Sequence, residues 1–243
     1  MSVLAYLHQG RPESYSALLA GLAAHGATVV AAEPGERLAE ALRGLCPLGF
    51  RGAFLEGEPL ERSAAAEAAR LEPEAREAGR VDALACDWSG PRGLFLAPLA
   101  LAELLGRTGY PGLRALWLGS ARPELAAGLR GVARIDVAAP IPGEGEAFLG
   151  RFAPAVRGTV ATRPDEVRAV AAQADLLIYG GGGLPRAVLA PYHTLLALAP
   201  VGAEAADLVE AVVGPEVFRA HRLALLAREV LGLSLPPEAF LDL

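Results

Sequence analysis

Apolar runs of strand length alternate with segments of helical periodicity through the first half of the chain. Within the helical segments, apolar residues recur three and four positions apart, whereas the runs between them are continuously apolar or nearly so. This pattern predicts strands at 3–8, 27–33, 50–56 and 81–88, and helices at 13–26, 36–45 and 60–79.

The second half of the chain repeats the alternation. Apolar strands that alternate with helices are typical of a parallel sheet covered on both faces, so the fold class predicted is α/β. We expect strands at 115–119, 133–138, 158–162 and 175–180, helices at 98–109, 123–131, 146–153, 164–174 and 215–232, and a loop rich in proline and glycine at 140–146.

Length and composition leave two architectures open. With 243 residues, of which 53% are hydrophobic and 21% charged, the chain can form one α/β barrel or two smaller α/β domains. Arg, Glu or Asp interrupts every long Ala/Leu segment, so no membrane span is expected. The first residues resemble a strand and lack the basic region of a signal peptide, which predicts a cytoplasmic protein.

The charge balance and the missing residue types exclude several functions. A net charge of −6 argues against a nucleic-acid partner, which requires a basic face. The sequence contains neither lysine nor asparagine, so Schiff-base chemistry, a P-loop lysine and lysine acid–base catalysis are excluded. Abundant Arg, Glu and Pro with a single Met favour a thermophilic source.

The two cysteines, Cys46 and Cys86, are too few for a disulfide framework and have no metal-ligand spacing. We expect both to be small buried hydrophobic residues. No metal site is predicted. Three acids, Glu56, Glu58 and Glu61, follow the strand at 50–56 closely, and we expect them to be solvated on a loop.

A glycine turn after the strand at 115–119 is the first candidate for cofactor binding. Dinucleotide-binding folds break a strand at a glycine and re-enter as a helix, so that backbone N–H groups face the pyrophosphate. Gly119 fits that pattern, but Arg122 and Pro123 stand where further glycines would be useful. The candidate residues in this turn are Gly119, Ser120, Ala121 and Arg122.

The glycine run at 180–183 is the second candidate, through Gly180 and Gly181. Successive unhindered N–H groups at the carboxyl end of a strand can form an anion nest, although such a run is also typical of a turn without function. Similarly, Ser14 and Ser16 at the start of the first helix are interpreted either as hydroxyl caps or as an anion site supported by the helix dipole.

Four stretches, taken in order, resemble the shikimate dehydrogenase family over nearly the whole chain. "SYSALL" resembles the S-x-S-P start of the family's first helix, and "GFRGAFLEGEPLE" resembles G-F-x-G-x-N-V-T-x-P-x-K. "EAREAGRVDAL" resembles the approach to G-A-V-N-T, and "ADLLIYGGGG" resembles A-D-[LI]-[LIV]-[IV]-N-A-T. These segments occupy 14–19, 49–61, 74–84 and 174–183.

The resemblance implies a two-lobed α/β fold. An N-terminal substrate-binding lobe would span residues 1–97, and a Rossmann-like, doubly wound parallel sheet would span 98–213. A C-terminal helix within 214–243 would return to the first lobe. The resemblance also assigns substrate binding to Ser14, Ser16, Asp82 and His221, the last of these lying with Arg222 near the family's glutamine position.

The departures from the family's motifs fall on its chemistry. Glu61 stands at the position of the catalytic lysine, and Phe54 and Glu56 stand at the preceding asparagine and threonine positions. The segment at 93–98, which corresponds to G-x-N-T-D, contains no acid. Because both members of the lysine–aspartate pair are missing, no catalytic residue is assigned.

Two functions follow from this resemblance and these departures. The first is a catalytically impaired or non-catalytic relative, a pseudoenzyme that keeps an inter-lobe cleft for a small anionic ligand. The alternative is an NAD(P)-dependent oxidoreductase acting on shikimate, quinate or a related hydroxy acid. We expect no cofactor, or NADP if a nucleotide is retained. The partners expected are a small anion and a second copy in a homodimer, with no nucleic acid and no membrane.

Overall fold

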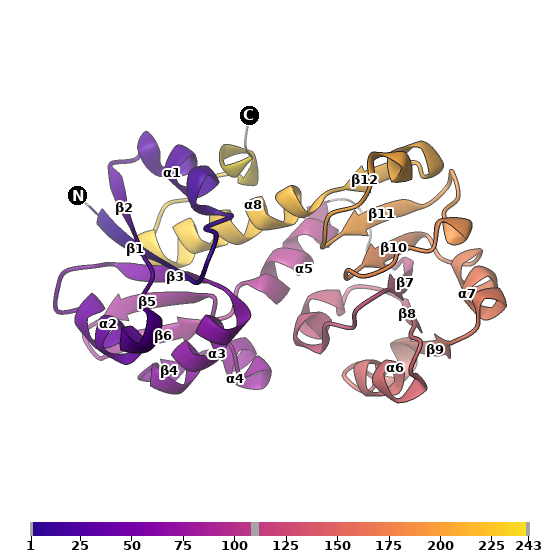
Figure 1. Ribbon diagram of the computed structural model, residues 1–243, viewed down its shortest axis with the longest axis horizontal. Coiled ribbons are helices and arrows are strands. Elements are labelled where there is room, and N and C mark those ends of the chain that lie inside the picture. The colour runs from indigo at the N-terminus through magenta and orange to yellow at the C-terminus, as the bar shows by residue number, and fades with distance from the viewer. Residues whose placement is uncertain (1, 108–111, 242–243) are drawn as a thin grey trace. The chain divides into compact units, whose positions relative to one another are not determined.

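The computed structural model describes residues 2–107 and 112–241 and divides the chain into two compact units. Unit 1 contains Met1–Ala100 together with Arg219–Leu243, and unit 2 contains Leu101–Phe218. The sequence predicted boundaries after 97 and 213, three and five residues away from those of the structure. Both units are α/β, as predicted, and Figure 1 labels their helices and strands.

Unit 1 contains a mixed sheet with the strand order β2-β1-β3-β5-β6-β4. β1 pairs in parallel with β2 and β3, whereas β5 is antiparallel to both β3 and β6. The strands are β1 (Ser2–His8), β2 (Ala27–Ala32), β3 (Gly52–Glu56), β4 (Arg70–Leu71), β5 (Ala83–Asp87) and β6 (Gly90–Leu94). The helices are α1 (Tyr15–Ala23), α2 (Leu38–Leu45), α3 (Glu58–Glu67) and α4 (Pro73–Ala78), followed by α5 (Ala97–Arg107), which continues into unit 2.

Unit 2 is built on six parallel strands in the order β12-β11-β10-β7-β8-β9. This is the strand order of the doubly wound dinucleotide-binding fold, so the Rossmann-like prediction is confirmed. The strands are β7 (Arg114–Leu118), β8 (Arg134–Ala138), β9 (Arg157–Ala161), β10 (Leu176–Tyr179), β11 (Thr194–Ala197) and β12 (Ala211–Val213). The α-helices that lie wholly within unit 2 are α6 (Pro142–Leu149) and α7 (Pro164–Ala171).

The C-terminal segment belongs to unit 1, as the resemblance implies. Helix α8 (Pro215–Leu226) continues as a π-helical turn, Ala227–Leu231, and ends at Gly232 with a φ of +70°. That turn packs against β3 and β5. Gly52 has no room for a side chain, because a Cβ there would lie 1.9 Å from the Leu84 carbonyl oxygen and 2.6 Å from Cγ1 of Val230 in this turn.

The single helix predicted at 60–79 is wrong, because α3 ends at Glu67 and Pro73 begins a separate helix. Pro73 restricts the backbone of the residue before it to extended conformations and cannot donate a helical hydrogen bond. Accordingly, Glu72 has a ψ of 160°, and Pro73 occupies the first turn of the separate helix α4. The short strand β4 lies between the two helices and pairs with β6.

Two further predictions in unit 2 are corrected. The segment after β7 forms a 3₁₀ helix at Pro123–Leu129 where an α-helix at 123–131 was predicted. The predicted loop at 140–146 contains the start of α6, which begins at Pro142, because a proline is well tolerated in the first turn of a helix.

The prediction for the cysteines is also wrong, because Cys46 and Cys86 form a disulfide with a Cα–Cα distance of 5.3 Å. Both residues are only partly buried. The fold brings them together because Cys46 ends helix α2, while Cys86 in β5 donates its backbone N–H to the carbonyl of Arg51 at 2.8 Å. Their separation of 40 residues hides this proximity from the sequence pattern.

Each unit has its own hydrophobic core. Tyr6 and Phe54 are fully buried in unit 1, and Trp117 and Phe148 are buried in unit 2 with ring centroids 4.9 Å apart. Among the residues that the structure describes, no helix is long and apolar enough to cross a lipid bilayer.

Candidate functional site

The carboxylate of Glu56, at the end of β3, occupies the N-terminus of helix α1 in unit 1. It accepts hydrogen bonds from the hydroxyl groups of Tyr6 and Ser14, and from the backbone N–H of Glu13 at 2.7 Å. The backbone N–H of Ser14 also points to it, at 3.4 Å. Helix N-termini attract negative charge, so a carboxylate is well placed here.

The residues around Glu56 are buried, and this shapes their ionisation. Ser14 is 1% exposed and Tyr6 is fully buried. Burial raises the pKa of the Tyr6 phenol well above its usual range, and the Glu56 carboxylate raises it further. Tyr6 is therefore a permanent hydrogen-bond donor to Glu56. The hydroxyl of Ser14 makes no cap to its own helix, which excludes the hydroxyl-cap interpretation for this residue.

Asp82 lies at a second polar position in unit 1, just before β5. Its carboxylate accepts hydrogen bonds from the backbone N–H groups of Leu96 at 2.6 Å and Ala97 at 3.1 Å, at the start of helix α5. Arg222 in α8 donates to it at 3.1 Å. Asp82 is fully buried, which raises the pKa of its carboxyl, and the guanidinium of Arg222 opposes that rise.

The charge of Arg222 is stabilised by three acids of unit 1, Asp82, Glu61 and Glu56. Its guanidinium carbon lies 5.4 Å from the ring centroid of Phe54, and its side chain is 19% exposed. Burial disfavours its charge, but Asp82 and then Glu61 and Glu56 outweigh burial and raise the pKa of the guanidinium. A buried arginine that faces several acids retains its charge.

Glu61, at the position where the resemblance places a lysine, forms an ion pair with Arg80. The Nε atom of Arg80 donates to its carboxylate at 3.0 Å, and the two side chains are 7% and 10% exposed. The expectation of three solvated acids on a loop is therefore wrong: Glu61 is buried in α3, and Glu56 holds the start of α1. Only Glu58, at the start of α3, is exposed.

The structure brings together some of the predicted substrate residues. Ser14 lies in the cluster around Glu56, and Asp82 lies in the cluster around Arg222. Ser16 is exposed in the first turn of α1. His221 is buried in α8 and is 4% exposed, while the neighbouring Arg222 is the residue that contacts Asp82. The role of these residues in substrate binding stays a prediction.

In unit 2, the predicted cofactor turn is joined directly to the glycine run after β10. Gly119 has a φ of +79°, and a Cβ on it would overlap the carbonyl oxygen of Gly181. The backbone N–H of Ser120 donates to that same oxygen at 3.0 Å, and Trp117 Nε1 donates to the Ser120 carbonyl at 2.9 Å. Gly180 also has no room for a Cβ, which would meet Ser120 and Trp117.

These contacts reduce the number of backbone N–H groups that the predicted turn can offer to a pyrophosphate. A pyrophosphate site needs free backbone N–H groups at the start of an α-helix. Here the Ser120 N–H is already used, and the segment that follows Ala121 is a 3₁₀ helix. Arg122 is directed to Glu124, with 3.3 Å between Nε and the carboxylate. The Ser120 N–H and the Arg122 side chain are therefore both engaged within unit 2.

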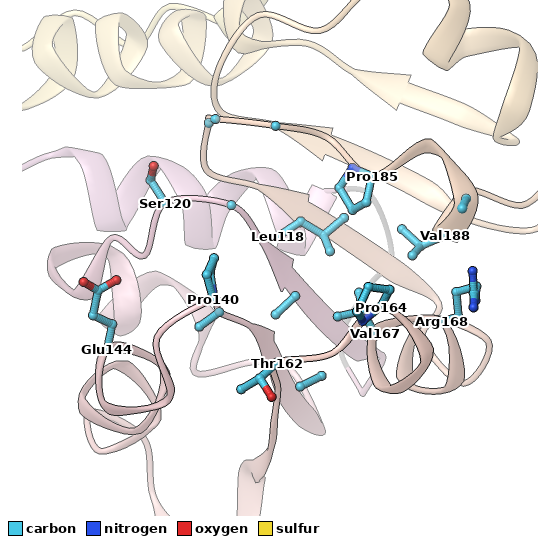
Figure 2. A pocket seen from close by; sticks show the side chains of 18 residues that line it. Leu118, Ser120, Pro140, Glu144, Thr162, Pro164, Val167, Arg168, Pro185 and Val188 are labelled. Atoms are coloured by element: carbon cyan, nitrogen blue, oxygen red, sulfur yellow. The ribbon is translucent and has the colours of Figure 1, made fainter.

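A cavity of about 490 Å³ opens at the carboxyl ends of β7, β8, β9 and β10 (Figure 2). In doubly wound sheets, ligands bind at this edge, beside the point where the strand order reverses. Leu118, Pro140, Pro164, Val167, Pro185 and Val188 supply much of the apolar lining, and the polar side chains are Ser120, Glu144, Thr162 and Arg168.

Glu144 is a lining residue that the sequence reasoning missed. The residues that directly follow β8, 139–142, include no acid, and the next helix was expected to begin at 146. Because α6 begins at Pro142, Glu144 lies in its first turn and lines the cavity. Figure 2 shows Glu144 on the same side as Ser120, with Arg168 on the opposite side. Arg168 is paired with Asp165.

The backbone of the glycine run faces the same cavity. Gly181, Gly182 and Gly183 line it, and the first two have φ values of +116° and +93°. Within the described part of the chain, the N–H groups of these three residues donate no hydrogen bond to backbone or side chains. They are therefore available to an anion. Among those same described residues, no group of three His, Cys, Asp or Glu side chains could hold a metal ion.

Comparison with known proteins connects this geometry to a family of folds. No protein-family model and no curated protein matches the sequence. Among solved structures, a ligand-free 5-ketofructose reductase from a Gluconobacter species superposes with a TM-score of 0.82 at 15% identity, covering 98% of this chain and 96% of that one.

Two further solved structures carry ligands. A quinate dehydrogenase from Corynebacterium glutamicum in complex with NAD has a TM-score of 0.81 at 16% identity, covering 98% and 96% of the two chains. Shikimate 5-dehydrogenase from Thermus thermophilus in complex with NADP(H) and shikimate has a TM-score of 0.78 at 24% identity, covering 99% and 97%. At identities this low, the superpositions show that the chain shares the fold of these proteins.

Proposed function

We propose that this chain is a catalytically impaired or non-catalytic relative of the shikimate and quinate dehydrogenases, which binds a small anionic ligand and transfers no hydride. The fold supports the relationship to this group of enzymes. The chemistry of the residues inside each unit supports the loss of activity. The binding of an anion is supported by the cavity of unit 2.

The observation that carries this proposal is the position of the Glu56 carboxylate. The resemblance assigns the start of the first helix to the carboxylate of the substrate. In this chain, the carboxylate of Glu56 accepts the hydrogen bonds of Ser14 and Tyr6 at that helix start. A second carboxylate would compete for the same donors and would be repelled by the first. We infer that unit 1 does not bind hydroxy acids in the manner of the enzymes.

The second support is the absence of an acid–base pair. Glu61 stands at the lysine position and forms an ion pair with Arg80. The segment Gly93–Pro98 contains no acid. The Asp82 carboxylate accepts hydrogen bonds from the backbone N–H groups at the start of α5, so it is not free to transfer a proton. An arginine remains protonated at working pH, so neither Arg80 nor Arg222 replaces a lysine as a proton donor.

The third support comes from the nucleotide turn. The N–H of Ser120 already donates to Gly181, and a 3₁₀ helix follows the turn, which supports the absence of a bound dinucleotide. The three free N–H groups of the glycine run and the hydroxyl of Ser120 are compatible with a small anion in the same cavity. A small anion needs no contact along the Gly119 turn.

One observation favours the alternative of an NAD(P)-dependent oxidoreductase. Glu144 lies on the cavity at the end of β8, where an acid can accept hydrogen bonds from ribose hydroxyls. The same acid repels a 2′-phosphate. If a nucleotide is retained, Glu144 therefore favours NAD over the NADP expected from the sequence.

Thermal shift measurements on the full chain test both functions. A ligand that binds only the native state raises the melting temperature. We expect inorganic phosphate to raise it, and shikimate, quinate and NADP to leave it unchanged. In the Glu144→Gln variant the phosphate effect increases, because a repelling charge is removed, whereas binding of NAD through its ribose would weaken.

An activity assay can refute the proposed loss of hydride transfer. Oxidation of NADPH or NADH in the presence of dehydroshikimate, at a rate proportional to the concentration of the purified chain, would refute the proposal. A phosphate effect that Glu144→Gln leaves unchanged would place the anion outside this cavity.

A further inference from the structure

The cavity of unit 2 has a polar end and an apolar end. Of the 18 residues that line it, ten have apolar side chains and four are glycines. Figure 2 shows Ser120 and Glu144 on one side of the cavity. Five apolar side chains lie on the other side: Leu118, Pro164, Val167, Pro185 and Val188. A ligand that fills the cavity therefore needs both a polar group and an apolar body.

The glycine run at 181–183 belongs to the polar end, because it contacts Ser120. The carbonyl of Gly181 accepts the backbone N–H of Ser120 at 3.0 Å, and a Cβ on Gly182 would lie 3.9 Å from the Ser120 hydroxyl oxygen. The three N–H groups of the run have no protein acceptor among the described residues. Successive N–H groups of this kind form anion-binding sites.

The orientation of the run is fixed by hydrogen bonds to its carbonyl groups. The hydroxyl of Tyr179 donates to the carbonyl of Gly182. Because the C=O and N–H of a planar trans peptide point in opposite directions, the N–H of Gly183 points away from Tyr179. Tyr179 and Gly182 line a separate cavity of about 280 Å³. A donor that is already oriented binds an anion with little loss of conformational freedom.

The volume of the cavity of unit 2 favours a ligand larger than a bare anion. Clefts of about 300–1,000 Å³ hold small-molecule ligands, and this cavity measures about 490 Å³. One water molecule in the liquid takes up about 30 Å³, so phosphate or acetate would fill only a small part of it. The apolar lining beyond the anion would remain in contact with water. A ligand with an apolar body covers that lining and gains about fourfold in affinity for each methylene buried.

The polar side chains restrict the chemistry of such a ligand further. Hydroxyl groups of a sugar or hydroxy acid would lose their water partners against the apolar lining. Arg168 is paired with Asp165, so it is not an unengaged cation. Glu144 lines the same cavity and repels each negative charge that enters it. A ligand with one negative charge is therefore favoured over one with two.

We propose that the cavity of unit 2 binds a monocarboxylate with an apolar body. The carboxylate accepts hydrogen bonds from the N–H groups of the glycine run, and the apolar body lies against Leu118, Val167 and Val188. This inference rests on the proposed function, because it names the class of small anion that the cavity takes.

Isothermal titration calorimetry on the full chain, with acetate, butanoate, hexanoate and octanoate, tests the proposal. Each added methylene that is buried should tighten binding about fourfold. The heat capacity change of binding should become more negative with chain length, because more apolar surface is buried. Hexanol has an apolar body of similar length without the charge, and it should bind about tenfold more weakly than hexanoate.

A pair of variants tests the location of the carboxylate. Ala187 is exposed and lines the cavity, so Ala187→Glu adds a second acid to the lining and should weaken octanoate binding about fivefold or more. The matched control is Ala169→Glu. Ala169 is an exposed alanine of α7 outside the cavity lining, and its replacement should leave octanoate binding unchanged.

Three outcomes would overturn the inference. Octanoate that binds no more tightly than acetate would refute the apolar body, and the proposed function would stand if phosphate still binds. Equal effects of Ala187→Glu and Ala169→Glu on octanoate would place the carboxylate outside this cavity. Tighter binding of adenosine monophosphate than of octanoate would favour the oxidoreductase alternative. If Ala187→Glu loses its native circular dichroism spectrum, the chain-length series on the wild type decides.

Discussion

Ser14 and Glu56 are 42 residues apart in the sequence, and the hydroxyl of Ser14 donates its hydrogen bond to the Glu56 carboxylate. The contact joins the end of strand β3 to the start of helix α1, and Tyr6 completes it from β1. A side chain of the protein therefore satisfies the hydrogen-bond donors at the start of α1.

Replacing Glu56 by threonine should open this position to a ligand. Threonine is the residue that the resemblance places here, and it leaves the hydroxyls of Ser14 and Tyr6 without the internal carboxylate. We expect shikimate to raise the melting temperature of Glu56→Thr by several degrees at saturating concentration, and that of the wild type not at all.

The matched control for this experiment is Glu67→Thr. Glu67 is an exposed acid in α3, so its replacement removes the same charge at a distance from Ser14. An equal effect of shikimate on Glu67→Thr and Glu56→Thr would show that net charge, and not the vacated position, controls binding.

Restoring the lysine alone should destabilise unit 1. Glu61→Lys places a second cation against Arg80 in a buried environment. Breaking a buried ion pair costs about 3–5 kcal/mol, because the remaining charge is left unpaired. Urea unfolding followed by circular dichroism should show this loss. The double variant Glu61→Lys/Arg80→Glu should recover much of it, and an unstable double variant would contradict the pairing.

The acid stability of unit 2 should depend on Glu166. Hydrogen bonds from the backbone N–H groups of Thr162 and Arg163 lower the pKa of its carboxyl from 4.5 to about 2. A pKa that is lower in the folded state stabilises the fold above the pKa of the unfolded chain, and this stabilisation is lost as the pH falls toward about 2. Glu166→Gln should therefore be less stable than the wild type at neutral pH and lose less stability on acidification.

Urea midpoints of both proteins between about pH 6 and about pH 2 measure this difference. Glu67→Gln is the control, because Glu67 is an exposed acid in unit 1. Parallel midpoint curves for wild type and Glu166→Gln would show that the carboxylate at the start of α7 has no stabilising role.

Reduction of the Cys46–Cys86 bond should destabilise unit 1. A cross-link between residues 40 positions apart restricts the unfolded chain, which corresponds to about 3–5 kcal/mol for loops of this size. We expect the urea midpoint to fall in the presence of dithiothreitol, and the double variant Cys46→Ser/Cys86→Ser to unfold at the lower midpoint without reductant. Two thiols that titrate in the native, unreduced protein would exclude the bond.

Local patterns predicted most of the fold. Apolar runs such as 3–8 and 175–180 are long enough and bounded clearly enough to predict β1 and β10. Helical periodicity did not detect the interruption at Pro73, because the residues on both sides favour helices. The strand β6, "GPRGL", was not predicted, since its stability comes from pairing with β5 and not from its own residues.

The candidate site was less predictable, because its contacts join distant segments. The sequence proposed Gly119 from its glycine turn, and Ser14 and Asp82 through the resemblance, but it could not show that Gly181, Glu56 and Arg222 contact them. The sequence shows that the lysine is missing, but it does not show that Arg80 is the partner of Glu61, the acid that replaces the lysine. That pairing depends on how the fold places a residue shortly before β5 next to α3.

The division of unit 1 between the two ends of the chain affects the order in which the protein can be made. Unit 2 is one continuous segment, so all of it is synthesised before residue 219 is translated. Unit 1 has no Arg222 to neutralise Asp82 until the last helix emerges. The first part of a nascent chain therefore lacks the partner of its buried acid until synthesis of unit 2 has finished.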